Sequence, residues 1–274
     1  MSLLSRTTID DREHLLLGFD AVMREQHPLL AKAPHCLLQL VFDPAYPFNN
    51  QAGTGGRAIG YWKIALSVAD LDIAHGRLVE KGIAVNEPFQ VPDVAYLCHC
   101  EDPDGYCVEL IQHRFQQNHV SLSTDNRFAL GTPTSFSLIT LRTRDPQQSI
   151  AFYETELGLR LVSKQEVAHR GFTLYFLSSD AEMPPSGRVE AIENRAWLWQ
   201  RPYAVLELQH VWGTENEPAE YYDTAPTTGL RNFGLLSKTL ATSIHGRKNH
   251  ALFGCPSMVM KDPDGYAIEI LKLD

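Results

Sequence analysis

The chain has 274 residues, of which 24 are Lys or Arg and 33 are Asp or Glu, so its formal net charge is −9. This acidic balance argues against nucleic acid or an anionic membrane surface as the main partner. No apolar run reaches about 18 residues, so we expect no membrane span. The five cysteines form an odd set without a CxxC pair, which indicates reduced thiols and a cytoplasmic protein: Cys36, Cys98, Cys100, Cys107 and Cys255.

The first half of the chain predicts one trimmed and one complete βαβββ module. Residues 10–45 predict a helix from Asp11 to about Leu30 and a strand over Cys36–Phe42. Strand Trp62–Val68 then leads to a helix that Asp70 caps and Gly82 ends. Three strands complete this second module, near 83–90, 94–101 and 105–112.

The second half repeats this order after a polar linker over 116–134. Strand Ser135–Thr143 precedes a helix with Asp145 as N-cap, Pro146 at its first position and Gly158 after its end. The remaining predicted elements are strands at 159–164, 171–178 and 202–212, and a shortened fourth module over 232–274. The sequence therefore predicts two domains, 1–115 and 135–274, each large enough to bury a core.

A ten-residue segment occurs twice, and each copy places a glutamate among apolar strand residues. Residues 101–110 read EDPDGYCVEL, and residues 261–270 read KDPDGYAIEI. Asp-Pro-Asp-Gly favours a type I turn, so each copy is a tight turn that runs into a strand. Glu109 and Glu269 then lie between apolar neighbours, where a carboxylate is unfavourable unless it is paired or binds a metal ion. The repeat marks two candidate sites, and a structural ion pair is the alternative at each.

These motifs resemble the vicinal oxygen chelate superfamily, which includes glyoxalases, extradiol dioxygenases and bleomycin resistance proteins. Segments 144–153 (RDPQQSIAFY) and 206–215 (LELQHVWGTE), with the DPDGYxxE hairpins, are most similar to glyoxalase I, above all over 136–215. The resemblance implies an α+β fold in which paired βαβββ modules form two glyoxalase-like domains with cup-shaped mixed β-sheets. It also implies a divalent metal ion (Ni, Zn, Co, Mn or Fe) and glutathione as co-substrate.

The same resemblance assigns site residues position by position. The glutamate ligands of the family fall on Glu207, Glu109 and Glu269. Four other ligand positions hold residues of different types, which are Leu138, Lys63, Leu235 and Gln39. The arginines that hold glutathione carboxylates match Arg142 and Arg231, and the apolar wall around the reacting carbon matches Leu174 and Phe176.

Two interpretations of the cup between the second and third modules remain open. In the first, His99, Glu109 and Glu207 bind a metal ion and leave positions open for substrate. In the second, the ammonium of Lys63 neutralises Glu109 and Glu207 without any metal ion, and these three groups still move protons next to a carbonyl. Glu269 belongs to a second cup that retains fewer ligands.

Three classes of function follow from these interpretations. The first is a divergent metal-dependent lyase or isomerase, related to lactoylglutathione lyase, that acts on a small oxygenated or thiol-adduct substrate. The second is a metal-free protein of the bleomycin resistance type that binds or sequesters a small molecule. The third, an extradiol dioxygenase, is disfavoured because the two histidines that would bind iron are missing at the matching positions. We expect a monomer or a homodimer.

Overall fold

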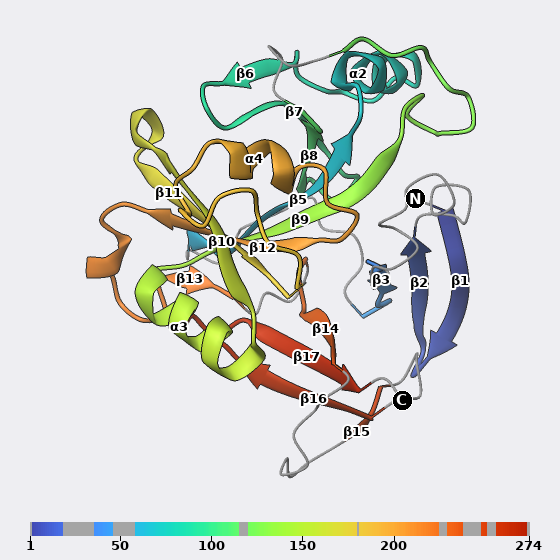
Figure 1. Cartoon of the computed structure of the whole chain (residues 1–274). Helices are drawn as coiled ribbons and strands as arrows, with labels where there is room; N and C mark the ends of the chain where they lie inside the picture. Colours follow the sequence, from blue (N-terminus) through green and yellow to red (C-terminus); the bar gives the residue numbers. More distant parts are fainter. Residues whose placement is uncertain are drawn as a thin grey trace.

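The computed structural model describes residues 2–18, 36–45, 58–114, 120–179, 181–224, 229–237, 248–250 and 256–272. Within these residues, no helix is long and apolar enough to cross a membrane. The strands outnumber the helices and form curled mixed sheets, as Figure 1 shows. The predicted α+β class with glyoxalase-like modules is confirmed.

The two central modules have the predicted order of elements. The second module consists of β5 (Tyr61–Val68), α2 (Leu71–Glu80), β6 (Phe89–Val91), β7 (Ala95–Glu101) and β8 (Cys107–Gln112). The third consists of β9 (Thr134–Arg142), α3 (Pro146–Leu157), β10 (Arg160–Val167), the 3-10 turn η2 (Ala168–Arg170), β11 (Phe172–Ser178), α4 (Glu193–Leu198) and β12 (Val205–Val211).

One eight-stranded sheet joins these two modules, in the order β10-β11-β12-β9-β5-β8-β7-β6. The junction is the antiparallel pair of β5 and β9, in which Ala65 lies opposite Leu138. Within each module the first and last strands are parallel, β5 with β8 and β9 with β12. The segment predicted as a linker therefore connects two modules that share a sheet, and the proposed domain boundaries stay a prediction.

The predicted helix ends are confirmed by their hydrogen bonds. The Asp70 side chain accepts from the backbone N–H of Ile73 at the start of α2. Asp145 accepts from the backbone N–H groups of Gln147 and Gln148 at the start of α3. At the other end of α3, Gly158 has φ of 67°, a left-handed conformation that glycine adopts without strain.

The strand predicted near 83–90 begins later than expected, at Phe89. Pro88 has no backbone N–H to donate to a neighbouring strand, which interrupts pairing before that point. Asn86 instead exchanges hydrogen bonds with His99, because its side chain accepts from the His99 N–H at 2.6 Å and its own N–H donates to the His99 carbonyl at 3.1 Å. These bonds fix the backbone of β7 at His99.

The helix predicted from Asp11 is wrong for the residues described there. β1 (Ser2–Ile9) and β2 (Arg12–Gly18) form an antiparallel hairpin, and β3 (Leu38–Phe42) pairs with β2 as the predicted strand. Asp10 and Asp11 take φ of 48° and 61°, a pair of left-handed conformations that suits a tight hairpin and that Asp tolerates. The rest of the predicted helix and Cys255 lie outside the described residues.

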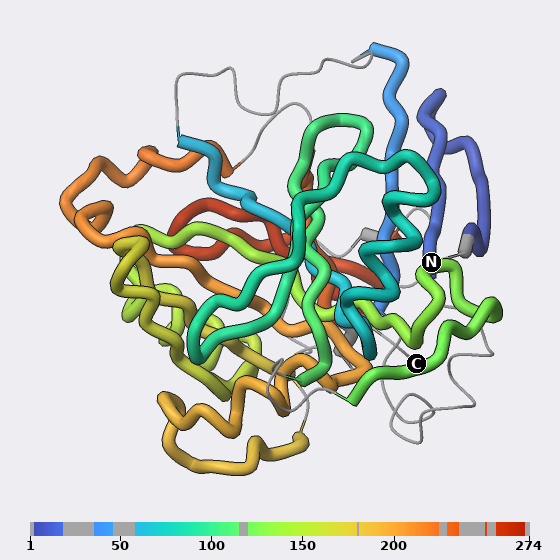
Figure 2. Tube along the Cα trace, turned by 90° about the horizontal axis from the view of Figure 1, so that it is seen from above, coloured from blue at the N-terminus to red at the C-terminus, as the bar shows by residue number. Residues whose placement is uncertain are grey.

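The remaining elements are short strands and a C-terminal sheet. They are β4 (Ala58–Ile59), η3 (Thr214–Asn216), β13 (Tyr222–Asp223), β14 (Phe233–Ser237), β15 (Lys248–Asn249), β16 (Pro256–Lys261) and β17 (Ala267–Lys272). β14 and β17 are parallel, as the first and last strands of the other modules are. Figure 2 shows the N-terminal hairpin at the rim of the molecule, away from the orange segment near residues 200–220.

Different clusters of buried side chains cover the two faces of the large sheet. On the convex face, α2 packs Leu71, Ala74 and Leu78 against β7 and β8. On the third module, Tyr153 of α3 belongs to a cluster that also contains Ile268 of β17. The concave face forms a third cluster, which Trp197, Leu198 and Trp199 around the end of α4 cover. The concave face is therefore the place where polar side chains are enclosed by apolar ones.

The two copies of the repeated turn have the same internal hydrogen bonds but different surroundings. Asp102 and Asp262 each accept from the backbone N–H groups two and four residues later, at 2.8–3.1 Å. Asp262 alone also accepts from the Tyr153 hydroxyl, at 2.6 Å. Burial raises the pKa of Asp262 to about 6, against the hydrogen bonds that lower it.

We expect the Asp262→Asn variant to remove a pH dependence from the stability of the fold. A folded-state pKa above the ordinary 3.8 means that the folded chain holds the proton more tightly, so stability falls as pH rises from about 4 to about 6. Over that interval, the difference in the free energy of unfolding between wild type and variant should change by on the order of 3 kcal/mol. Chemical denaturation at a series of pH values measures it, with Asp102→Asn as the matched control. Parallel stability curves for wild type and Asp262→Asn would contradict this assignment.

Candidate functional site

Strand register brings five polar side chains together on the concave face. Lys63 on β5 pairs with Thr140 on β9, and Thr140 pairs with Glu207 on β12, so these residues form a row across the sheet. Glu109 on β8 lies beside Ala65, two residues further along β5, and pairs with His99 on β7. Side chains two residues apart on a strand share a face, so both rows point into the same cup.

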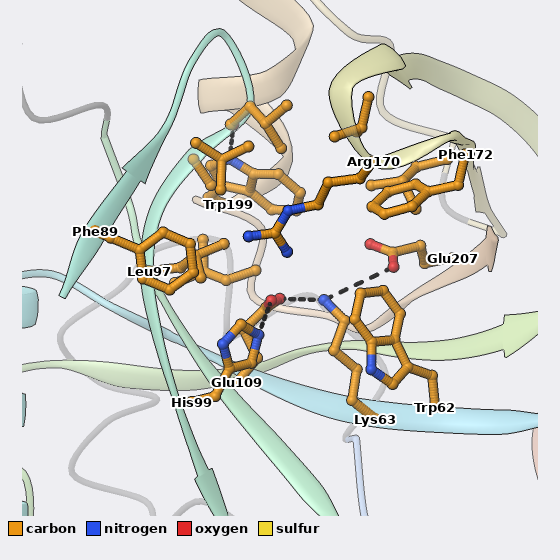
Figure 3. A pocket seen from close by; sticks show the side chains of 16 residues that line it. Trp62, Lys63, Phe89, Leu97, His99, Glu109, Arg170, Phe172, Trp199 and Glu207 are labelled. Atoms are coloured by element: carbon orange, nitrogen blue, oxygen red, sulfur yellow. Dashed lines mark hydrogen bonds and ion pairs between the residues drawn. The ribbon is translucent and has the colours of Figure 1, made fainter. Parts of the chain in front are cut away.

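The five groups form a connected network, and Figure 3 shows four of them: Lys63, His99, Glu109 and Glu207. The Lys63 ammonium donates a hydrogen bond to Glu109 Oε1 and lies 3.8 Å from Glu207 Oε1. His99 Nε2 is 2.9 Å from Glu109 Oε2, and the Thr140 hydroxyl donates to Glu207 Oε1 at 2.9 Å. Lys63, Glu109 and Glu207 are only 3%, 2% and 1% exposed, so their charges interact with little screening by water.

Burial and neighbouring charges move the pKa values of the two glutamates in opposite directions. For Glu109, the effect of burial is outweighed by the charges and hydrogen bonds of Lys63 and His99, so its pKa is lowered. For Glu207, burial dominates the attraction of Lys63, and the negative charge of Glu109 adds to it, so its pKa is raised. Burial also opposes the charged form of Lys63, but the two carboxylates outweigh it and raise the pKa of the ammonium. Lys63 and Glu109 are therefore a charged pair, and Glu207 is the group most ready to gain and lose a proton.

Aromatic and aliphatic side chains close the cup around this network. The cavity measures about 40 Å³, which accommodates a few water molecules. Its remaining lining is Trp62, Phe89, Val91, Val94, Ala95, Leu97, Ile111, Val167, Arg170, Phe172, Leu174 and Trp199. Trp199 donates from its indole N–H to the Val94 carbonyl at 3.2 Å, which ties the end of α4 to the second module.

The other predicted site residues occupy different places. Leu174 lines the cavity, whereas Phe176 is fully buried behind it, 5.5 Å from the Trp199 ring between centroids. Arg142 does not line the cavity, because its guanidinium donates to Gln209 Oε1 at 3.1 Å and to the Ile59 carbonyl at 2.7 Å. Arg231 is exposed and also lies outside the lining.

The second candidate cup is less complete in the described residues. Glu269 Oε2 accepts from the Asn232 side chain at 3.2 Å and lies 3.6 Å from His250 Nε2. Gln39 hydrogen bonds instead with His14, at 2.8 Å. Leu235 is half-buried in the cluster that Tyr153 and Ile268 share. Glu269 therefore has polar neighbours but no second carboxylate at hydrogen-bonding distance among the described residues.

Sequence reasoning missed two residues that complete the first site. Arg170 lies at the end of η2 and points its guanidinium into the pocket from the opposite wall to His99 (Figure 3). Trp199 directly follows α4, which has only six residues. A helix this short has no apolar stripe by which the sequence could predict it. An apolar run flanked by charges, as in Ala196 to Trp199, is the one signal in the sequence that a buried turn of helix lies there.

The donor set does not fit a divalent metal ion in the arrangement that the family resemblance implies. The Lys63 ammonium lies between Glu109 and Glu207, where such an ion would bind, and its positive charge repels a second cation. Leu138 occupies another expected ligand position, is fully buried and carries no donor atom. Among the described residues, no group of three or more His, Cys, Asp and Glu side chains is arranged to hold a metal ion.

Comparisons with known proteins agree with this fold. Residues 135–270 match the model of the Glyoxalase/Bleomycin resistance protein/Dioxygenase superfamily. The resemblance to that superfamily inferred from the sequence is confirmed over this part of the chain.

Similar proteins carry the names glyoxalase I and lactoylglutathione lyase. Glyoxalase I of Saccharomyces cerevisiae is 27% identical over 250 residues, which cover 84% of this chain and 68% of that protein. Lactoylglutathione lyase of Schizosaccharomyces pombe is 24% identical over 244 residues, covering 85% and 72%. A glyoxalase I mutant from Zea mays has the same fold, with a TM-score of 0.63 at 18% identity over 99% of this chain and 84% of its own. The chain is thus similar to glyoxalase I proteins, and the names of these relatives suggest a lyase-type enzyme.

Proposed function

We propose that this protein is a metal-independent lyase or isomerase that moves a proton on a carbon next to a carbonyl group. The observation that carries the proposal is the Lys63 ammonium between two buried carboxylates whose pKa values differ. In this arrangement Lys63 supplies the fixed positive charge that a bound metal ion supplies in the family mechanism. The metal-dependent form that the sequence favoured is supported less well, because Lys63 and Leu138 replace ligands.

The proposed reaction assigns a separate role to each glutamate. The Glu207 carboxylate takes a proton from the carbon beside the carbonyl, and the electron pair of that C–H bond moves to the carbonyl oxygen. The resulting enolate is stabilised by a hydrogen bond from the Lys63 ammonium, in a site with little water. Glu207 then returns the proton to the same carbon. Where that carbon carries a hydroxyl group, Glu207 can instead protonate the former carbonyl carbon while the hydroxyl proton passes to the enolate oxygen, so that atoms and charge balance. Glu109 and His99 keep Lys63 charged and in place.

The co-substrate follows from the relatives and stays part of the proposal. Lactoylglutathione lyases are named for a glutathione adduct, and this chain is similar to them. The cavity of about 40 Å³ is small for such an adduct. We therefore expect slow turnover of the methylglyoxal–glutathione hemithioacetal and faster turnover of a smaller carbonyl compound. The cytoplasmic location and the state as monomer or homodimer also stay predictions.

Deuterium exchange tests the proposed proton transfer without knowledge of the product. Pyruvate and the methylglyoxal–glutathione hemithioacetal are incubated with the protein in D₂O, and NMR follows deuterium incorporation at the carbon next to the carbonyl. We expect catalysed exchange of at least one compound, at a rate that extended treatment with a chelator leaves unchanged.

Two outcomes would reject the proposal in different ways. A rate that falls with chelator and returns on addition of a divalent metal ion would favour the metal-dependent enzyme. Binding of these compounds without any exchange would favour the metal-free binding protein of the bleomycin resistance type.

A further inference from the structure

Arg170 brings a positive charge to the pocket from outside the polar network. It is the last residue of η2, in the turn between β10 and β11, and Gly171 follows it with φ of 70°. Figure 3 shows its side chain reaching down between Phe172 and Trp199, with the guanidinium directed toward Glu109. The guanidinium carbon lies 5.8 Å from the centre of the Phe89 ring, on the opposite module. A residue of the third module thus crosses the mouth of the cup and contacts the second.

The two carboxylates of the network already have partners other than Arg170. Glu109 uses one carboxylate oxygen for Lys63 and the other for His99. Glu207 accepts from Thr140 and faces Lys63. Within the described parts of the chain, the Arg170 guanidinium forms no ion pair with a carboxylate, and its identified partner is the Phe89 ring. The pocket therefore contains one guanidinium that is paired with no carboxylate of the described residues.

A guanidinium in this position is suited to an incoming anion. It offers five N–H donors in a planar fork that matches both oxygens of a carboxylate. The residue as a whole is exposed, so an anion reaches it from solvent. Its contact with Phe89 is the weak kind of cation–π interaction that exposed residues make, so the side chain moves aside at little cost when a ligand enters. Such a movement would also enlarge the small cavity.

We propose that Arg170 binds a carboxylate of the substrate, and that the substrate contains a small carbonyl compound. This inference rests on the proposed function, because the contact between Arg170 and the carboxylate would orient the substrate carbonyl toward Lys63 and Glu207. It assigns the anion-binding role to Arg170 in place of Arg142, which lies outside the pocket lining and donates to Gln209 and the Ile59 carbonyl. The carboxylate belongs either to the carbonyl compound itself or to a thiol carrier such as glutathione.

The test compares binding of charged and uncharged ligands by tryptophan fluorescence, because Trp62 and Trp199 line the pocket. Pyruvate, its neutral amide and glutathione are titrated into wild type, Arg170→Met and Arg170→Lys. We expect wild type to prefer pyruvate over the amide, and Arg170→Met to bind pyruvate about tenfold more weakly, since a hydrogen-bonded ion pair is lost. Arg170→Lys should be intermediate, because an ammonium cannot bind both oxygens in the same plane. Arg188→Met, the same change at an exposed arginine outside the pocket lining, controls for net charge.

The outcomes separate this inference from the proposed function. Loss of pyruvate or glutathione binding in Arg170→Met supports the inference, and the compound whose binding is lost is the one whose carboxylate Arg170 binds. This result holds even if no compound undergoes exchange. Equal affinity of wild type and Arg170→Met for every carboxylate would overturn the inference, and would leave the proposed function standing if exchange is still catalysed. An equal loss in Arg188→Met would also overturn it, since the effect would then arise from overall charge.

Discussion

Replacing Lys63 with methionine is expected to lower the free energy of unfolding by about 3–5 kcal/mol, because removal of one partner from a buried ion pair leaves an uncompensated charge. Glu109 and Glu207 are both almost fully buried and share Lys63. Without the Lys63 ammonium, their two negative charges repel each other. Methionine keeps most of the length of the side chain, so the change removes charge more than volume. Chemical denaturation monitored by tryptophan fluorescence measures the effect.

The pH dependence of the Lys63→Met variant distinguishes lost charge from lost packing. Without the ammonium, the folded-state pKa values of Glu109 and Glu207 rise above their unfolded values. Stability of the variant should then recover as pH falls toward about 4, where both glutamates are protonated in the folded chain. Lys261→Met, at an exposed position of β16, is the matched control. A loss below about 1 kcal/mol, the size typical of an exposed ion pair, would show that Lys63 is not the partner of the two glutamates.

The second large effect concerns activity. The Glu207→Gln variant is expected to slow deuterium exchange by about 100-fold or more, the range typical of a missing general base. The amide still accepts the Thr140 hydrogen bond through its oxygen, so the fold should be retained. The wild-type rate should rise with pH as Glu207 loses its proton, at a pH above the ordinary range for Glu because its pKa is raised. The residual rate of the variant should lack this rise.

Two comparisons make the Glu207 result specific. Glu220→Gln changes an exposed glutamate outside the pocket lining and should leave the rate unchanged. Glu109→Gln should lose stability as well as activity, because it removes the hydrogen-bonded partner of Lys63. If Glu207→Gln retained a tenth or more of the wild-type rate, another group would have to move the proton.

The central modules were predictable because several local signals agreed. Asp70, Asp145, Pro146 and Gly158 mark helix ends by simple hydrogen-bonding and steric rules, and the structure places caps at those positions. Alternation along β8 put Glu109 among buried neighbours, and pairing of adjacent strands put His99 beside it. Where such agreement was missing, as at Arg12–Gly18, a run of Leu residues was consistent with either a helix or a strand, and the Asp10–Asp11 turn decided for the strand.

The contents of the site were predictable only in part, because they depend on contacts between distant segments. The positions of Glu109, Glu207 and Lys63 followed from family likeness, but the sequence left open how close the Lys63 ammonium lies to each carboxylate. Arg142 was expected to face the substrate, and its guanidinium is instead engaged by Gln209 and Ile59. Arg170 was missed because its position at the cup mouth depends on how the β10–β11 turn bends over the other module.

The most direct test of the central claim, that Lys63 takes the place of a metal ion, is the metal content of the purified chain. Wild type and the Lys63→His variant are each reconstituted with Ni²⁺, Zn²⁺ or Co²⁺, freed of unbound metal and analysed for metal per chain. The imidazole introduced by this substitution would join His99, Glu109 and Glu207 as a set of nitrogen and oxygen ligands that these ions accept. We predict that wild type retains only traces of metal while the variant retains close to one ion per chain. One ion per wild-type chain, lost in Glu207→Gln, would contradict the claim.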